Sequence, residues 1–297
     1  MRGRVLLAIA ILAISTGAPF ARWAAPADPI AVAALRVGFA SILLFALGWR
    51  DIGALRRVKR GDATYVVLAG VLLGIHFGSW IASLSFTSTA ASVALVCTNP
   101  IFAALFGTLL GDRVTPREIT GIVVAAGGCA VLAGGDWSAG GDALIGDGLA
   151  LVGAASAAGY LVVGRRLREA LPLLPYLGVV NAIAAVGLIA ATIVMGVNIV
   201  ALEPIAYVAC AGAALVASTL GHSLLNAAVR VTPTHLVALA ILGEPIGSSL
   251  ITWIAFGEQP PVHAVLGGAI VLAGIALGFV RFANGRRAAP VAGDRPA

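Results

Sequence analysis

Ten long apolar runs divide the chain, and short polar segments separate them. A helix needs about 20 apolar residues to cross the roughly 30 Å of hydrocarbon in a bilayer, and each run is close to that length. The runs do not alternate in polarity as the strands of a membrane β-barrel do. We therefore predict an all-α integral membrane protein with ten transmembrane helices, at residues 5–21, 29–49, 63–85, 89–110, 118–135, 145–164, 173–195, 204–228, 233–256 and 262–282.

Basic residues gather in every second loop. Counting the loops from a cytoplasmic N-terminus, the outer loops contain Arg22 as their one basic residue and are otherwise neutral or acidic. Cytoplasmic loops of membrane proteins carry an excess of Lys and Arg, so this pattern predicts that both termini are cytoplasmic. In a bacterium the protein would lie in the inner membrane. The inner loops contain Arg50, Arg56, Arg57, Lys59, Arg60, Arg113, Arg117, Arg165, Arg166, Arg168 and Arg230.

The composition supports a membrane protein and argues against a nucleic-acid partner. Hydrophobic residues make up 60% of the chain and charged residues 11%, whereas about a quarter of a soluble domain is charged. The net charge of +6 comes from short bends between apolar runs, which leave no basic domain to read a groove. The three cysteines lie in three different runs, so they form no disulfide framework.

The second half of the sequence repeats the first. The pair Asn99-Pro100 lies ahead of a loop that starts at Gly111, and Glu244-Pro245 lies ahead of one that starts at Gly257. Each half has five predicted spans, an odd number, so the halves enter the membrane in opposite directions. We expect inverted five-helix repeats at residues 1–140 and 141–284, followed by a disordered cytoplasmic tail at 285–297.

These motifs resemble the EamA-type, ten-helix branch of the drug/metabolite transporter superfamily. The resemblance rests on Leu35-Arg36-Val37-Gly38-Phe39, on Leu242-Gly243-Glu244-Pro245, and on Phe256-Gly257-Glu258 followed by Gly267. It implies secondary transport of amino acids, nucleobases, drugs or related metabolites, often outward. It also implies a central cavity lined by helices 1, 3 and 4 of one repeat and 6, 8 and 9 of the other. The second repeat has Asn181 in place of Arg36, so any role of Arg36 is asymmetric.

Charged and amide groups within the spans are candidates for substrate binding, because they are costly in hydrocarbon. Glu244 lies near the middle of the ninth span, where a low dielectric constant favours a protonated carboxyl group, so it can bind a coupled proton or a cation, or join neighbouring helices. Asn99 is its repeat mate and either contacts the solute or bonds another helix. Arg36 can hold a carboxylate, neutralise Glu244, or extend toward the membrane surface.

Polar residues also follow one face of the third and eighth spans. Spacings of three, four and seven residues place each set on one side of its helix, and the two sets align under the repeat. We expect both stripes to line the shared cavity, although single histidines on apolar helices more often only pack. For Trp80 a place in the interfacial aromatic belt competes with this role. The stripes are His76, Ser79 and Ser83 with Trp80, and Thr219, His222 and Asn226.

Several classes of function lack their motifs. The single lysine, Lys59, lies in no phosphate-binding loop, so we expect no ATP site of the Walker type, no cofactor, and a secondary mechanism. No HExxH or other metal-ligand motif occurs, and Gly221-His222-Ser223 only approaches a nucleophile elbow, so we expect no enzyme. Lipid flipping stays open as an alternative, as does the choice between monomer and homodimer. The hypothesis is alternating access by rocking of residues 1–140 against 141–297.

Overall fold

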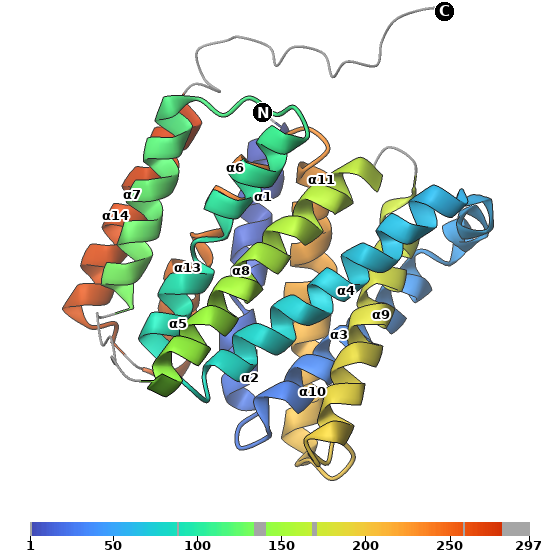
Figure 1. Cartoon of the computed structure of the whole chain (residues 1–297). Coiled ribbons are helices and arrows are strands. Elements are labelled where there is room, and N and C mark those ends of the chain that lie inside the picture. Colours follow the sequence, from blue (N-terminus) through green and yellow to red (C-terminus); the bar gives the residue numbers. More distant parts are fainter. Residues whose placement is uncertain (1, 88, 134–140, 168–170, 258, 281–297) are drawn as a thin grey trace, which may run out of the picture.

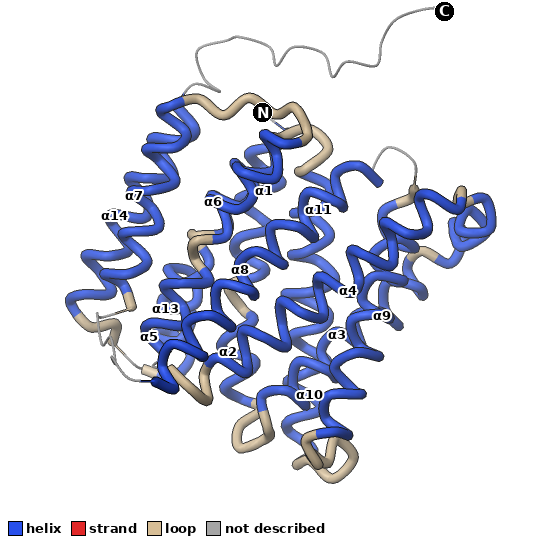
Figure 2. Tube along the Cα trace, in the orientation of Figure 1, coloured by secondary structure: helices blue, strands red, loops and turns tan. Residues whose placement is uncertain are grey.

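The computed structural model describes residues 2–87, 89–133, 141–167, 171–257 and 259–280. Within these ranges every regular element is a helix, as Figure 2 shows. The predicted tail at 285–297 lies outside the described residues, as do Arg168 and Glu258. The prediction of an all-α membrane protein is confirmed by this helical architecture.

Within the described residues, nine helical segments are long and apolar enough to cross a membrane. The remaining predicted span is α7, whose 17 residues cover about 26 Å at 1.5 Å per residue. The count of ten is consistent with these lengths. The first repeat contains α1 (Arg2–Ile14), α2 (Gly17–Trp23), α3 (Pro29–Leu47), the 3-10 helix η1 (Trp49–Arg57), α4 (Arg60–Ser83), α5 (Thr89–Val96), α6 (Asn99–Leu109) and α7 (Pro116–Leu132). The second contains α8 (Gly141–Leu167), α9 (Leu173–Val194), α10 (Pro204–Ala213), the π-helical η2 (Ala214–His222), α11 (Ser223–Ala228), α12 (Thr234–Ile241), α13 (Glu244–Phe256) and α14 (Val262–Phe279).

Two repeat-related spans are broken at equivalent places. The fourth span divides into α5 and α6 just before Asn99, and the ninth into α12 and α13 just before Glu244. Pro100 and Pro245 are the second residues of the new helices, where a missing N–H group costs nothing but the preceding helix cannot continue. The first span is also interrupted, at Ser15. Broken helices therefore meet in the interior of the bundle, as they do around the binding sites of many transporters.

The two repeats interleave, so neither forms a separate five-helix bundle. In Figure 1, α14 lies beside α7, α9 beside α3, and α8 beside α4, each pair joining one helix of each repeat. Glycines allow the closest approach: a Cβ atom on Gly128 of α7 would lie 2.6 Å from the backbone nitrogen of Val271 in α14. On α4, Gly74 lies against the backbone of Ala184 in α9. These glycines of the third and fifth spans thus let helices of the two repeats pack closely.

The bundle has two distinct ends. α1 begins and α14 ends at the same end, at the top of Figure 1, and we call this the termini end. α6 and α8 also end there, and α7 and α12 begin there. At the opposite end, Trp23, the last residue of α2, packs edge-to-face against Phe256 of α13, with ring centroids 5.9 Å apart. The broken first and ninth spans therefore touch at that end.

Candidate functional site

Arg36 points into the protein rather than toward the membrane surface. Its Nε donates a hydrogen bond of 2.8 Å to the hydroxyl oxygen of Ser218, and its guanidinium lies over the Phe77 ring at 5.3 Å from the centroid. Nη2 lies 3.5 Å from Nε2 of His222. Because guanidinium only donates, this geometry makes His222 Nε2 the acceptor. α3 thus places a cation between the two repeats, held by η2 of the other repeat.

The π-helical segment η2 supplies both partners of Arg36. Ser218 and His222 are four residues apart in it, and the i→i+5 bonding of a π-helix widens each turn. The carbonyl of His222 accepts a hydrogen bond of 2.9 Å from the side-chain amide of Asn226, one turn later. The π-helical segment is therefore anchored at its end by the next helix.

His76 belongs to α4 of the first repeat and is held in place by α8 of the second. Its Nδ1 lies 2.9 Å from the carbonyl oxygen of Gly153 in α8, and since a carbonyl accepts, Nδ1 carries the hydrogen. The imidazole lies nearly parallel to the Trp80 ring, with the ring centroids 6.2 Å apart and an interplanar angle of 8°. His76 and His222 both lie within electrostatic range of Arg36.

Glu244 is the first residue of α13, at the break of the ninth span. Its backbone carbonyl accepts a hydrogen bond of 3.3 Å from the Ser15 hydroxyl at the break of the first span, and Ser248 donates to the carbonyl of Ser15 at 2.8 Å. Gly247 fits directly against Ser15, because a Cβ atom there would overlap its hydroxyl group. The carboxyl group interacts electrostatically with Arg36. The two breaks therefore form one polar junction.

These four side chains form a cluster, the central site: Arg36, His76, His222 and Glu244. All four are partly exposed although they belong to membrane-spanning helices. They come from four predicted spans of both repeats. The arrangement offers one cation, one carboxyl group and two imidazoles within a small region, which suits recognition of a polar solute.

The sequence profile of the EamA-like transporter family matches residues 1–134 and 144–280, which is nearly the whole chain. The chain belongs to the EamA-like transporter family. One solved structure, described only as the crystal structure of a protein, is similar to this EamA-like chain with a TM-score of 0.80. The two share 20% sequence identity over 95% of this chain and 98% of the other, so the likeness concerns the fold. No curated protein shows significant sequence similarity.

Not every predicted residue of this EamA-like transporter reaches the central site. Asn99 is buried at the start of α6 with its amide oxygen unpartnered, and within the described part of the chain no hydrogen bond joins it to the cluster. Ser79 bonds the Ile75 carbonyl of its own helix at 2.7 Å. Trp80 reaches the site only through its stack on His76, and its indole nitrogen is buried without a partner. As substrate-binding residues these three stay predictions, as do the four residues of the central site.

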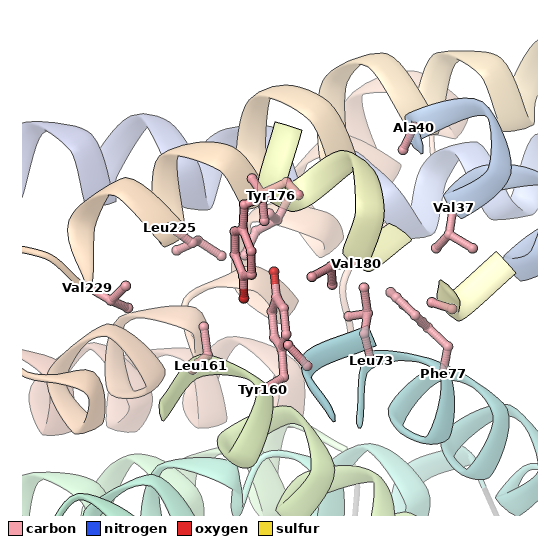
Figure 3. Packing of buried hydrophobic residues seen from close by; sticks show 14 of the residues in the cluster. Val37, Ala40, Leu73, Phe77, Tyr160, Leu161, Tyr176, Val180, Leu225 and Val229 are labelled. Atoms are coloured by element: carbon pink, nitrogen blue, oxygen red, sulfur yellow. The ribbon is translucent and has the colours of Figure 1, made fainter. Parts of the chain in front are cut away.

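Asn226 is hydrogen-bonded to other residues of the protein. Its amide nitrogen donates to the hydroxyl of Tyr160 at 2.7 Å as well as to His222, and the residue is fully buried. Figure 3 shows the hydroxyl groups of Tyr160 and Tyr176 pointing toward each other within the surrounding apolar residues. Asn226 therefore supports the central site through its bond to the backbone of His222.

Sequence reasoning missed several groups of this EamA-like site. Ser218, Phe77 and the carbonyl of Gly153 each hold a charged or imidazole group in place. Only Ser218 carried a usable signal, since it lies one helical turn before His222. Within the described residues no group of three or more His, Cys, Asp or Glu side chains is placed to hold a metal ion.

Proposed function

We propose that this protein is a secondary transporter that carries small polar metabolites, such as amino acids, nucleobases or drugs, by alternating access through the central site. The resemblance to the EamA family favours export. Glu244 is proposed to bind the coupled proton or a cationic group of the solute. Both termini are proposed to be cytoplasmic, since η1 and the starts of α4 and α7, which lie at the termini end in Figure 1, carry the basic residues Arg56, Arg60 and Arg117.

The observation that carries this proposal is the inward-facing guanidinium of Arg36. A charge within the membrane is costly, by about 2.5–3.5 kcal/mol or more on insertion scales. Of its five N–H donors, one is committed to Ser218 and another contacts His222. The remaining donors suit a carboxylate, phosphate or carbonyl oxygen of a solute. Because the Arg36 guanidinium is costly within the membrane and has further N–H donors, solute binding explains it better than helix packing does.

The packing favours motion of half-helices over rocking of whole repeats. A rigid rotation of residues 1–140 against 141–297 would separate the backbones of α7 and α14, which touch at Gly121 and Gly274. It would also break the bond of 2.9 Å from Ser41 in α3 to the carbonyl of Gly178 in α9. Movement of the half-helices at the breaks would leave the α7–α14 contact and the Ser41–Gly178 bond intact. We propose that α2, α6, α12 and α13 move about their breaks while the paired helices hold the frame.

The test is solute exchange by the purified protein in liposomes. A panel of labelled amino acids, nucleobases and cationic drugs is loaded inside, and exchange is compared for wild type and Arg36→Gln. Loss of one charge-assisted contact corresponds to roughly a 10- to 100-fold reduction for the transported solute. Arg230→Gln is the matched control, because Arg230 is exposed and outside the central site.

Three results contradict the proposal. Equal exchange by wild type and Arg36→Gln removes the central site from transport. Formation of a chemical product without exchange moves the protein to a membrane-embedded enzyme. Movement of fluorescent lipids between leaflets, with no exchange of any water-soluble solute, favours the flippase alternative.

A further inference from the structure

A second group of titratable side chains lies at the termini end, away from the central site. We call Asp112, Glu118, Arg165 and His235 the termini-end cluster. Asp112 lies in the loop after α6, Glu118 in the first turn of α7, Arg165 in the last turn of α8 and His235 in the first turn of α12. The cluster therefore joins elements of both repeats.

His235 is the unusual member of the cluster. Only 1% of its surface is exposed, and neither imidazole nitrogen has a hydrogen-bond partner. Buried polar groups nearly always have partners, so a buried imidazole with two free nitrogens calls for an explanation. Its Nε2 lies 3.8 Å from Oε2 of Glu118, about 1 Å longer than a charge-assisted hydrogen bond.

The charges around His235 do not balance while the imidazole is neutral. Among the described side chains, the charged groups that face it are Glu118 on α7, Asp112 after α6 and Arg165 on α8. Arg165 forms an ion pair with Asp112, with Nη1 and Oδ2 2.5 Å apart. Among the described residues, the Glu118 carboxylate accepts one hydrogen bond, from the backbone N–H of Thr115 at 2.6 Å in the capping box of α7. Two carboxylates thus face one guanidinium among the described side chains, with the helix dipole of α7 as further partial compensation for Glu118. An imidazolium at His235 would balance the remaining charge.

We propose that His235 and Glu118 form a proton-binding site that latches α12 to α7 at the termini end. Proton uptake at the imidazole gives an Nε2–H donor that closes onto the Glu118 carboxylate. No other atom is exchanged. In the unprotonated state the contact stays open and α12 is held by apolar packing alone.

The latch bears on the proposed function because α12 is one arm of the broken ninth span. The other arm, α13, starts with Glu244 of the central site. A proton bound at His235 would thereby hold one half-helix in place at the expected cytoplasmic end. This role in transport rests on the proposed function, whereas proton binding itself can be tested without any solute.

The experiment is amide hydrogen exchange of the full chain in lipid nanodiscs at about pH 5 and about pH 8, which lie on either side of the ordinary pKa of histidine. Exchange is corrected for the intrinsic effect of pH and read in peptides from α12 and, for comparison, α13. The proposal expects protection of the first turns of α12 to be roughly tenfold higher at the lower pH, the strength of one charge-assisted bond. Protection of α13 should not change by this factor.

Two variants and one control make the result specific. Glu118→Gln keeps the capping box, which accepts Gln as well as Glu, but removes the charge. His235→Gln removes the titrating group. In both, the pH dependence of α12 should disappear, whereas His263→Gln, exposed and in the first turn of α14 at the opposite end, should keep it. If one variant fails to fold, the other still decides.

The proposal is overturned if wild-type α12 shows the same corrected protection at both pH values. It is equally overturned if the pH dependence persists in Glu118→Gln or His235→Gln. Either result would leave the proposed transport through the central site unaffected. Failure of the latch and failure of the proposed function are therefore distinguishable.

Discussion

Arg36 of α3 and Ser218 of η2 are 182 residues apart in the chain and joined by a hydrogen bond of 2.8 Å. This bond ties the first repeat to the second at the guanidinium of the central site. It also fixes the direction in which the remaining donors of Arg36 point. The orientation of Arg36 therefore depends on the π-helical segment of the other repeat.

Replacing Ser218 by alanine should misplace this guanidinium. Ser218→Ala leaves Nε–H without its acceptor, a loss of about 1–3 kcal/mol. We expect a lower melting temperature in detergent and weaker solute binding in the exchange assay. Thr64→Ala is the control, since the exposed Thr64 hydroxyl bonds only its own helix. A Ser218→Ala protein that matches this control in both measurements contradicts the positioning role.

The buried amide of Asn226 should contribute mainly to stability. Asn226→Ala removes the bonds to the His222 carbonyl and to the Tyr160 hydroxyl, and each costs about 0.5–1.5 kcal/mol. Tyr160→Phe removes only one of them. Thermal unfolding should therefore show the larger decrease for Asn226→Ala. The reverse order would mean that the amide does not support η2.

Much of this architecture could be predicted from local sequence signals. The apolar runs define the spans, and the Asn99-Pro100 and Glu244-Pro245 pairs mark where the fourth and ninth spans break. Prolines act locally, because each removes a donor from its own helix. The break at Ser15 has a proline signal too, because Pro19 in α2 cannot donate to the carbonyl of Ser15 four residues earlier. Sequence reasoning overlooked Pro19 and treated that span as continuous.

Most partners of the predicted residues could not be read from the sequence. Small-residue spacing identifies the contact face of α4, but not that Gly74 meets Ala184 of the other repeat. Helical periodicity of 3.6 residues selected Thr219 beside His222. The wider π-helical turn instead brings Ser218 to Arg36. The Gly74–Ala184 contact and the Ser218–Arg36 bond both depend on how helices distant in sequence pair in three dimensions.

The interleaved contact of α7 and α14 predicts a sharp difference between two adjacent glycines. Gly128→Ala would place a Cβ atom 2.6 Å from the Val271 backbone, so the helices must separate and stability should fall by about 1–3 kcal/mol. A Cβ atom on Gly127 meets nothing within 4 Å. Gly127→Ala should be neutral or stabilising by up to about 1 kcal/mol. Equal melting temperatures for the two variants would contradict the packing.

The junction between the first and ninth spans should be equally sensitive to a single methyl group. Gly247→Ala would overlap the Ser15 hydroxyl and push α13 away from the break in the first span. We expect solute exchange to fall severalfold, a barrier change of about 1 kcal/mol. Gly187→Ala on α9, where a Cβ atom meets nothing within 4 Å, is the matched control and should exchange normally. Normal exchange by Gly247→Ala would show that the breaks do not work together.

The most direct test of the central site is the effect of a proton gradient on Glu244→Gln in liposomes. The amide is nearly isosteric with the carboxyl group but cannot release a proton. We predict that wild-type protein accumulates its solute against a gradient when protons flow the other way. Glu244→Gln should still exchange solute at equal pH but no longer accumulate it. Proton-driven accumulation by Glu244→Gln at the wild-type level would contradict the account.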